Sequence, residues 1–296
     1  MKAPLQDRAA AKPASPLIRA AKFIAALGRN IRQNLGQWCL AVARPPQAQI
    51  SRPPPIAIVA IVATLAAIVA SMFLIDAAST DWARHLPHWF TEEFELITNA
   101  GESGWVLVPC GLLVLFFAAL TSPALPTLTQ GVLAALAARF GFLFLAIGTP
   151  GLFATIVKRL IGRARPYMDM HGDPFTYVPF AWRPEYASLP SGHATTAAAT
   201  ALAIGALWPR TRGVMWLYAL VIMFSRVVVQ SHHPSDAIAG ALVGAVGAAL
   251  VRRWFAARRL VFCARDLSAY SGPSLRRSLA AVGRALGEAW TDARRP

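Results

Sequence analysis

The chain has 296 residues, of which 56% are hydrophobic, and its formal net charge is +15 at neutral pH. Its apolar residues gather in long uncharged runs, which excludes an ordinary soluble domain and predicts an integral membrane protein. The three cysteines, Cys39, Cys110 and Cys263, are scattered and odd in number, so they indicate neither a disulfide framework nor a metal site.

The N-terminal segment, residues 1–52, is basic and contains one predicted helix. Between Leu17 and Val42, apolar residues recur at helical spacing and most basic residues lie off that stripe. Prolines at 45–46 and 53–55 then interrupt the chain. We expect a basic amphipathic helix on the inner leaflet, with a docking site for a partner protein as the alternative.

Residues 53–255 form the predicted membrane core. Its first span, residues 56–75, holds twenty residues without a charge, which suffice to cross a hydrocarbon core of about 30 Å. This run lies too far from the N-terminus for a cleaved signal peptide, so we expect an uncleaved anchor. Five further spans are predicted at residues 105–120, 140–157, 193–208, 214–230 and 237–251.

Two longer connections join these spans. Residues 76–103 hold six acidic residues and one arginine, with a short helix expected near residues 90–98. His85 and His88 lie there, but we interpret them as loop histidines rather than as a metal-binding pair. Residues 169–189 are rich in proline and aromatic residues, which suit either an interfacial belt or contact with a lipid substrate.

The C-terminal segment, residues 256–296, resembles the N-terminal one in composition. A stripe of apolar residues from Leu275 to Trp290 has arginines beside it, and it predicts a second helix on the membrane surface. The predicted fold is therefore all-α: an integral membrane six-helix bundle with basic amphipathic cytoplasmic tails.

The distribution of charge predicts the orientation. Nine Lys and Arg residues stand against one acid before Ile56, and ten arginines stand against three acids from Arg252 onward. By the positive-inside rule both termini are cytoplasmic, which requires an even number of spans. Topology and anionic lipid explain the basic tails better than nucleic acid does, so we expect no nucleic-acid partner.

Three short stretches place polar residues at the ends of predicted spans: residues 158–166 (KRLIGRARP), 190–193 (PSGH) and 225–236 (SRVVVQSHHPSD). Cations at membrane depth are costly unless they face a partner, so such a cluster marks a functional site. The partner that these residue types fit is a phosphate. Lysine and arginine supply positive donors, Ser191 supplies a hydroxyl and Gly192 an unobstructed amide, while imidazoles can act as acid or nucleophile.

Spacing predicts the local geometry of the first two stretches. Lys158 and Arg165 are two helical turns apart, so we expect them on one face of the third span. Arg159 and Arg163 fall on other faces, where we expect them to contact headgroups or fill the loop. Ser191 suits the cap of the next helix, whose first-turn amides form an anion site.

The third stretch contains adjacent histidines followed by an aspartate. Pro234 fits the first position of a helix, which places Asp236 in its first turn. There the carboxylate can reach back to the ring of His232 and fix its tautomer, leaving the other nitrogen free to attack. His233 is the rival nucleophile, and we expect it to face the membrane interface.

In this order, the three stretches resemble the signature of the type 2 phosphatidic acid phosphatase superfamily. That signature reads Lys, six residues, Arg-Pro; then Pro-Ser-Gly-His; then Ser-Arg, five residues, His, three residues, Asp. The resemblance spans roughly residues 100–252, and no fixed position departs from the pattern. The matching residues are Lys158, Arg165, Pro166, Pro190, Ser191, Gly192, His193, Ser225, Arg226, His232 and Asp236.

The resemblance implies a metal-independent lipid phosphate phosphatase that needs no cofactor. His232, rather than His233, attacks phosphorus to give a phosphohistidine, Asp236 orients its ring, and His193 protonates the departing oxygen. The phosphate is held by the five remaining site residues: Lys158, Arg165, Ser191, Gly192 and Arg226.

The topology predicted from charge places all three stretches on the extracytoplasmic side of a bacterial inner membrane. The implied partner is a phosphorylated lipid: phosphatidic acid, phosphatidylglycerol phosphate, undecaprenyl pyrophosphate or a lipid A phosphate. The motifs recognise the phosphoryl group that these lipids share and do not choose among them, nor do they set the oligomeric state. A lipid-to-lipid phosphotransferase and a non-catalytic lipid-phosphate binding or transport protein are the alternatives.

Overall fold

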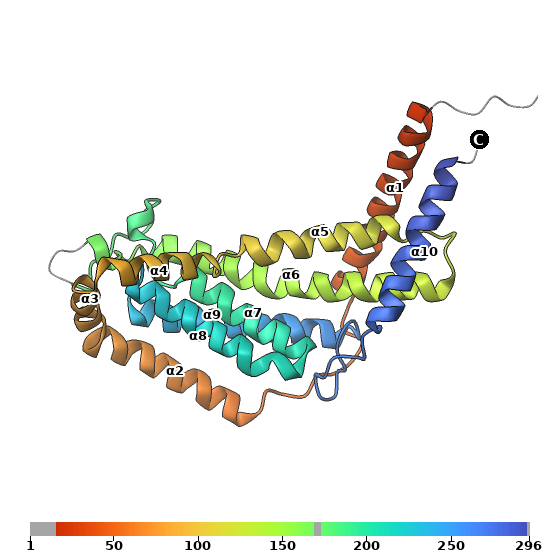
Figure 1. Ribbon diagram of the computed structural model, residues 1–296. Coiled ribbons are helices and arrows are strands. Elements are labelled where there is room, and N and C mark those ends of the chain that lie inside the picture. Colours follow the sequence, from red (N-terminus) through yellow and green to blue (C-terminus); the bar gives the residue numbers. More distant parts are fainter. Residues whose placement is uncertain (1–15, 169–172, 295–296) are drawn as a thin grey trace, which may run out of the picture. The chain divides into compact units, whose positions relative to one another are not determined.

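The computed structural model describes residues 16–168 and 173–294 (Figure 1). Within these ranges every extended regular element is a helix, and β-structure is limited to two isolated bridges, Arg163–Tyr177 and Phe262–Ala269. The predicted all-α class is therefore confirmed. Two compact units form, which we describe separately: residues 1–40, 115–137 and 272–296, and residues 41–114 and 138–271.

The first unit contains the two amphipathic helices expected at the ends of the chain. They are α1 (Pro16–Ala43) and α10 (Leu275–Arg294). The end of α5 (Gly104–Leu120) and the start of α6 (Thr127–Ile161) also belong to this unit. In α1, the Asn34 side chain donates hydrogen bonds to the carbonyls of Ala118 (2.9 Å) and Thr121 (2.8 Å). The tail helices exist as predicted, and their place on a membrane surface remains a prediction.

The second unit is a bundle around α7 (Gly192–Leu207), which packs on α8 (Arg212–Val228) and α9 (Pro234–Ala257) (Figure 1). The α2 helix (Pro55–Leu74) lies against α9. The short helices α3 (Asp76–Arg84) and α4 (His88–Asn99) pack on α8. These last two occupy the connection in which one short helix was expected. Three 3₁₀ turns complete the elements, at Pro166–Met168, Pro184–Tyr186 and Pro209–Thr211.

Small residues allow α7 and α9 to approach closely. A Cβ at Gly240 would meet the carbonyl oxygen of Ser191, and one at Gly244 would meet that of Thr195. Most residues of α7 are buried alanines and threonines, so its burial reflects backbone proximity rather than large side chains. This packing sets the N-terminal ends of α7 and α9 beside each other.

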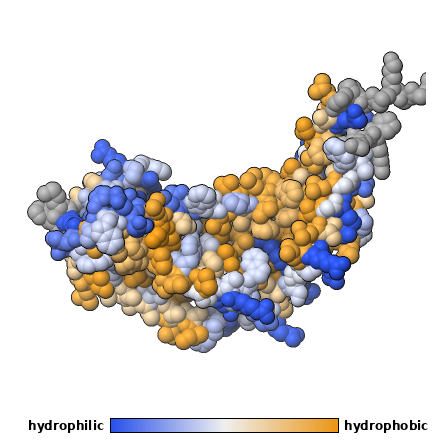
Figure 2. All heavy atoms as spheres, in the orientation of Figure 1, coloured by the Kyte–Doolittle hydropathy of each residue, from blue (hydrophilic) through white to orange (hydrophobic). Residues whose placement is uncertain are grey.

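Five helical segments in the described residues are long and apolar enough to cross a membrane: Pro55–Leu74, His88–Leu120, Thr127–Ile161, Pro209–Val228 and Pro234–Ala257. The sixth predicted span is α7, which has 16 residues and lies inside the bundle. Apolar side chains such as Val62, Leu65 and Phe73 of α2 are exposed. Figure 2 shows hydrophobic residues, in orange, over much of the visible surface. A lipid environment would cover them.

Candidate functional site

The three polar stretches meet at one end of the second unit. Ser191 caps α7, and its backbone N–H donates to the carbonyl of Asp236 in the first turn of α9 (3.0 Å). The backbone N–H of His232 donates to the carbonyl of Arg226, in the last turn of α8 (3.2 Å). The first of these hydrogen bonds joins the second stretch to the third, and the other holds the third stretch together.

A cleft of about 550 Å³ runs beside these helix ends. Its walls include Lys158, Gly192 and His193. A Cβ at Gly192 would lie 3.7 Å from Nζ of Lys158, so the absence of a side chain leaves the α7 amides open toward this cation. An ammonium group beside a helix N-terminus forms a binding site for an anion.

The structure corrects the expected helical face of the first stretch. The α6 helix ends at Ile161, four residues before Arg165. Gly162 ends it, because its φ of +67° favours glycine and a Cβ there would overlap the carbonyl of Val178. Lys158 is therefore helical, whereas Arg165 lies in the following irregular segment and does not share a helix face with it.

The cations that were expected to hold phosphate have no carboxylate partner. Among the described residues, neither Lys158, Arg165 nor Arg226 forms an ion pair. Arg226 donates to the Thr98 hydroxyl (2.7 Å), but its Nε and that of Arg165 are buried without a hydrogen-bond partner in the described part of the chain. Buried cationic donors without partners are costly, so the arrangement favours an anion.

His232 is almost fully buried, and its environment favours the neutral ring. Burial is the largest cause that lowers the pKa of His232 well below its ordinary value, and the nearby Arg165, Arg226 and His193 lower it further. The Asp236 carboxylate raises the pKa of His232, but this effect does not outweigh burial and the nearby cations. A neutral imidazole has a free lone pair, which a nucleophile needs.

Asp236 does not bond His232 directly. Its Oδ2 lies 3.9 Å from Nδ1 of that ring, beyond hydrogen-bond length, and instead accepts from the Ser188 hydroxyl (2.6 Å) and the His233 backbone N–H (2.9 Å). Ser188 in turn lies 3.5 Å from His232 Nδ1. The predicted proximity of Asp236 to His232 is present, with a serine between them.

Two sequence predictions about neighbouring residues are wrong. His233 does not face the interface: it is buried, with its Nδ1 3.4 Å from Asp236. Arg163 neither contacts headgroups nor merely fills the loop, because its fully buried guanidinium pairs with Asp236 (2.6 Å) and Asp76 (2.8 Å). Close-packed helix ends leave no route to solvent for either side chain.

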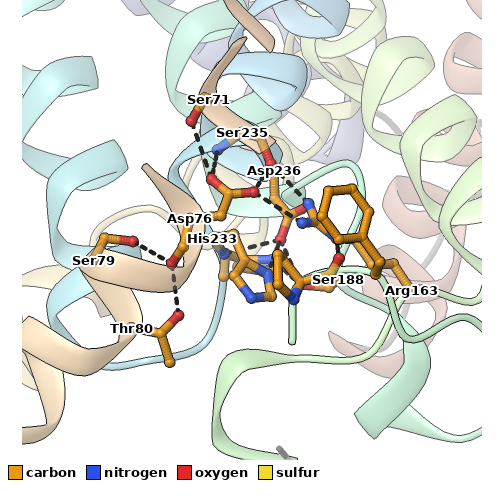
Figure 3. Close-up of polar contacts among 12 residues, drawn as sticks. Ser71, Asp76, Ser79, Thr80, Arg163, Ser188, His233, Ser235 and Asp236 are labelled. Carbon is orange, nitrogen blue, oxygen red and sulfur yellow. Dashed lines mark hydrogen bonds and ion pairs between the residues drawn. The ribbon is translucent and has the colours of Figure 1, made fainter. Parts of the chain in front are cut away.

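Asp76 is the polar residue that sequence reasoning missed. It was grouped with the acidic loop, yet it is fully buried and accepts hydrogen bonds from Ser71 (3.0 Å) and the Ser235 backbone N–H (3.0 Å) (Figure 3). The available signal was its position directly after a twenty-residue apolar run. A carboxylate at the end of a span needs a partner as much as a cation does.

The described residues contain no group of three or more His, Cys, Asp and Glu side chains arranged to hold a metal ion. His85 and His88 are exposed. His85, directly after α3, pairs with Asp81 (3.9 Å), and His88 pairs with Glu92 of the same helix, α4 (3.1 Å).

Known proteins share the sequence features of this site. A model of the PAP2 superfamily matches residues 139–260, which contain all three polar stretches. A lipid A 1-phosphatase of Rhizobium johnstonii is 35% identical over 200 residues, covering 67% of this chain and 81% of that protein. The chain belongs to the PAP2 superfamily.

Two further proteins resemble this PAP2 chain. A lipid A 1-phosphatase of Rhizobium etli is 35% identical over 183 residues, 61% of this chain and 77% of the relative. The crystal structure of a transmembrane PAP2-type phosphatidylglycerolphosphate phosphatase from Bacillus subtilis shares 20% identity with a TM-score of 0.45, over 65% of this chain and 94% of that one. The family model and the two lipid A 1-phosphatases confirm the family resemblance predicted from the three stretches.

Proposed function

We propose that this PAP2 protein hydrolyses a phosphomonoester or pyrophosphate headgroup of a membrane lipid. The observation that carries this proposal is a set of three cations around His193, Lys158, Arg165 and Arg226, none of which forms an ion pair among the described residues. Arg165 and Arg226 also lie near the buried His232. Both curated relatives are lipid A 1-phosphatases, so a lipid A phosphate is the first substrate to test.

The proposed reaction has two steps. Nε2 of His232 forms a bond to phosphorus while the bond from phosphorus to the leaving oxygen breaks, and His193 gives that oxygen a proton. Water then attacks the phosphorus of the phosphohistidine and gives a proton to His193, while the bond from Nε2 to phosphorus breaks. Inorganic phosphate is released, and both histidines return to their starting states. The cations, the Ser191 hydroxyl and the Gly192 amide hold the non-bridging oxygens as their charge increases. No step requires a metal ion.

We assign the hydrophobic tail of the substrate to the cleft beside His193. Besides polar residues such as Glu102 and Thr155, its walls carry apolar and small residues of α5 and α6, including Leu107, Gly148 and Leu152. A lipid whose phosphate reaches His193 can therefore leave its tail between these two helices. This geometry favours a lipid over a small soluble phosphate.

We further propose that the site faces the periplasm or cell exterior. The charge distribution of the chain supports this orientation. A cysteine replacing the exposed Trp182 should react with an impermeant thiol reagent in intact cells, whereas native Cys39 should stay protected. Labelling in the opposite sense would place the site in the cytoplasm.

Phosphate release by the purified full chain tests the function. We expect release from at least one of lipid A, phosphatidic acid, phosphatidylglycerol phosphate and undecaprenyl pyrophosphate, with activity retained in EDTA. In ¹⁸O-labelled water, one labelled oxygen should appear in the product, because water rather than a second lipid accepts the phosphoryl group. Phosphate found on another lipid would indicate a phosphotransferase, and binding without turnover would indicate a transport or binding protein.

A further inference from the structure

Asp76, Arg163 and Asp236 form a buried cluster of charges (Figure 3). Ser188 lies between this cluster and His232. Asp76 begins α3, and both of its carboxylate oxygens are occupied: Oδ1 by Ser71 and the Ser235 backbone, Oδ2 by Arg163 and the Ser235 hydroxyl. Its side chain is fully buried. Burying a carboxylate has a large desolvation cost, which the hydrogen bonds and the ion pair with Arg163 offset.

Arg163 connects this carboxylate to Asp236. One terminal nitrogen, Nη2, donates to Asp76 (2.8 Å), while Nη1 donates to Asp236 Oδ1 (2.6 Å) and to the Ser235 hydroxyl (2.7 Å). The remaining Nε donates to the Pro174 carbonyl (2.9 Å). The planar fork therefore fixes the direction of both carboxylates, which a lysine ammonium could not do.

The same chain of contacts continues to His232 through Ser188. A serine hydroxyl has one hydrogen, and Ser188 donates it to Asp236 Oδ2 (2.6 Å). Its oxygen can then only accept from His232, whose Nδ1 lies 3.5 Å away. This geometry favours the tautomer in which Nδ1 carries the ring proton and Nε2 is unprotonated.

We propose that Asp76 is a positioning residue, which acts through Arg163, Asp236 and Ser188 to fix the orientation and tautomer of His232. This inference rests on the proposed function for the role of His232. Asp76 lies outside the residues matched by the family model, 139–260, so the family signature does not contain it. It joins the start of α3 to the catalytic end of α9.

The net charge of the cluster supports the same role. Two carboxylates face one guanidinium, so the cluster is negative while His232 is neutral. When Nε2 attacks phosphorus, positive charge develops on the ring, and a negative cluster behind Nδ1 stabilises it. Asp76 thus contributes charge as well as geometry, and replacing it with asparagine removes the charge while keeping the shape.

The first test separates positioning from folding by comparing Asp76→Asn with Asp81→Asn, an exposed aspartate of the same helix. For Asp76→Asn we expect kcat to fall about 10–100-fold. A loss of this size is typical when a residue that orients a metal-binding histidine is replaced. KM should change little, because Asp76 does not line the phosphate site. Asp81→Asn should match the wild type. An unchanged kcat in Asp76→Asn would overturn the proposal.

A second variant serves if Asp76→Asn does not fold. Ser188→Ala removes the serine between Asp236 and His232 without removing a charge. Ser79→Ala is its control, because the Ser79 hydroxyl donates to the backbone carbonyl of Asp76 (2.8 Å) and not to its carboxylate. We expect Ser188→Ala alone to lower kcat. Equal activity in both serine variants would contradict the role of Ser188 in the chain of contacts.

The last readout does not depend on activity. In ¹⁵N-histidine NMR spectra of the full chain, assigned with His232→Gln, the wild-type ring should show a protonated Nδ1 and an unprotonated Nε2 at about pH 7. Asp76→Asn or Ser188→Ala should give a mixture of tautomers. A single unchanged tautomer in both variants would overturn the proposal even if phosphatase activity is present. An inactive wild type with the expected spectra would instead refute the proposed function and leave the positioning role standing.

Discussion

Arg163 and Asp236 form an ion pair of 2.6 Å in which both side chains are completely buried. The pair joins the segment after α6 to the first turn of α9, so it ties two of the three polar stretches together. Burial by itself would lower the pKa of Arg163, but the pairing with Asp236 and Asp76 outweighs it and raises that pKa. Arg163 therefore stays charged throughout the working pH range.

Removing Arg163 should destabilise the protein strongly. Arg163→Ala leaves two buried carboxylates without their common partner, and breaking a buried pair in this way costs about 3–5 kcal/mol. Unfolding by denaturant in detergent micelles should report a loss of this size. Arg159→Ala, four residues earlier and without an ion pair among the described residues, serves as the control. A loss below about 1 kcal/mol, as for an exposed pair, would contradict the buried network.

Narrowing the cleft should affect lipids more than soluble phosphates. Gly151 lines the cleft, and a Cβ there meets nothing within 4 Å, so Gly151→Leu adds side-chain volume at the cleft wall. We expect kcat/KM for a long-chain lipid to fall while that for a soluble phosphomonoester is retained. Gly131→Leu, on an exposed part of the same helix, is the matched control. Equal losses of kcat/KM for both substrates would contradict the assignment of the lipid tail to this cleft.

The acid limb of the pH profile should respond to Arg165. Protonation of His232 blocks attack, so activity is lost as pH falls through its pKa, which lies well below 6.5 mainly because of burial. Arg165 also lowers that pKa. Arg165→Gln should therefore raise it and move the acid limb of kcat/KM to higher pH. The substrate itself titrates identically with the wild type and with Arg165→Gln. An acid limb at the same pH in both enzymes would therefore show that Arg165 does not affect the pKa of His232.

The leaving group should reveal the role of His193. A phosphomonoester expels an alkoxide, which needs a proton, whereas a pyrophosphate expels a more stable phosphate. General acid catalysis is worth about 10²–10⁴-fold, so His193→Ala should impair monoester hydrolysis far more than pyrophosphate hydrolysis. The comparison requires kcat for both substrates. Equal losses would mean that His193 binds phosphate rather than donating a proton.

Much of the architecture could be predicted from local sequence. Apolar runs and stripes gave the six core helices and both tail helices, because helix burial in lipid follows from composition over about 20 residues. Ser191 caps α7 and Asp236 lies in the first turn of α9, as predicted, since capping chemistry fixes the residues at the start of a helix.

The buried cluster could not be predicted in the same way. Asp76 and Ser235 are 159 residues apart, and only the packed bundle brings them together. The helix face expected to hold Lys158 and Arg165 could not be predicted correctly either. Gly162, with its positive φ, ends α6 before Arg165. Arg163 looked peripheral because its partners, Asp76 and Asp236, are distant in the sequence. The burial of His233 depends on the packing of the bundle, which its position in the sequence does not show.

Trapping the intermediate tests the central claim most directly. The full chain is mixed with ³²P-labelled lipid, quenched within a turnover and digested, and the acid-labile, base-stable label is mapped by peptide analysis. The account predicts phosphate on His232, its absence from His232→Ala, and its retention in His233→Ala, which keeps the backbone N–H that bonds Asp236. Label on His233, or rapid phosphate release by His232→Ala, would contradict the account.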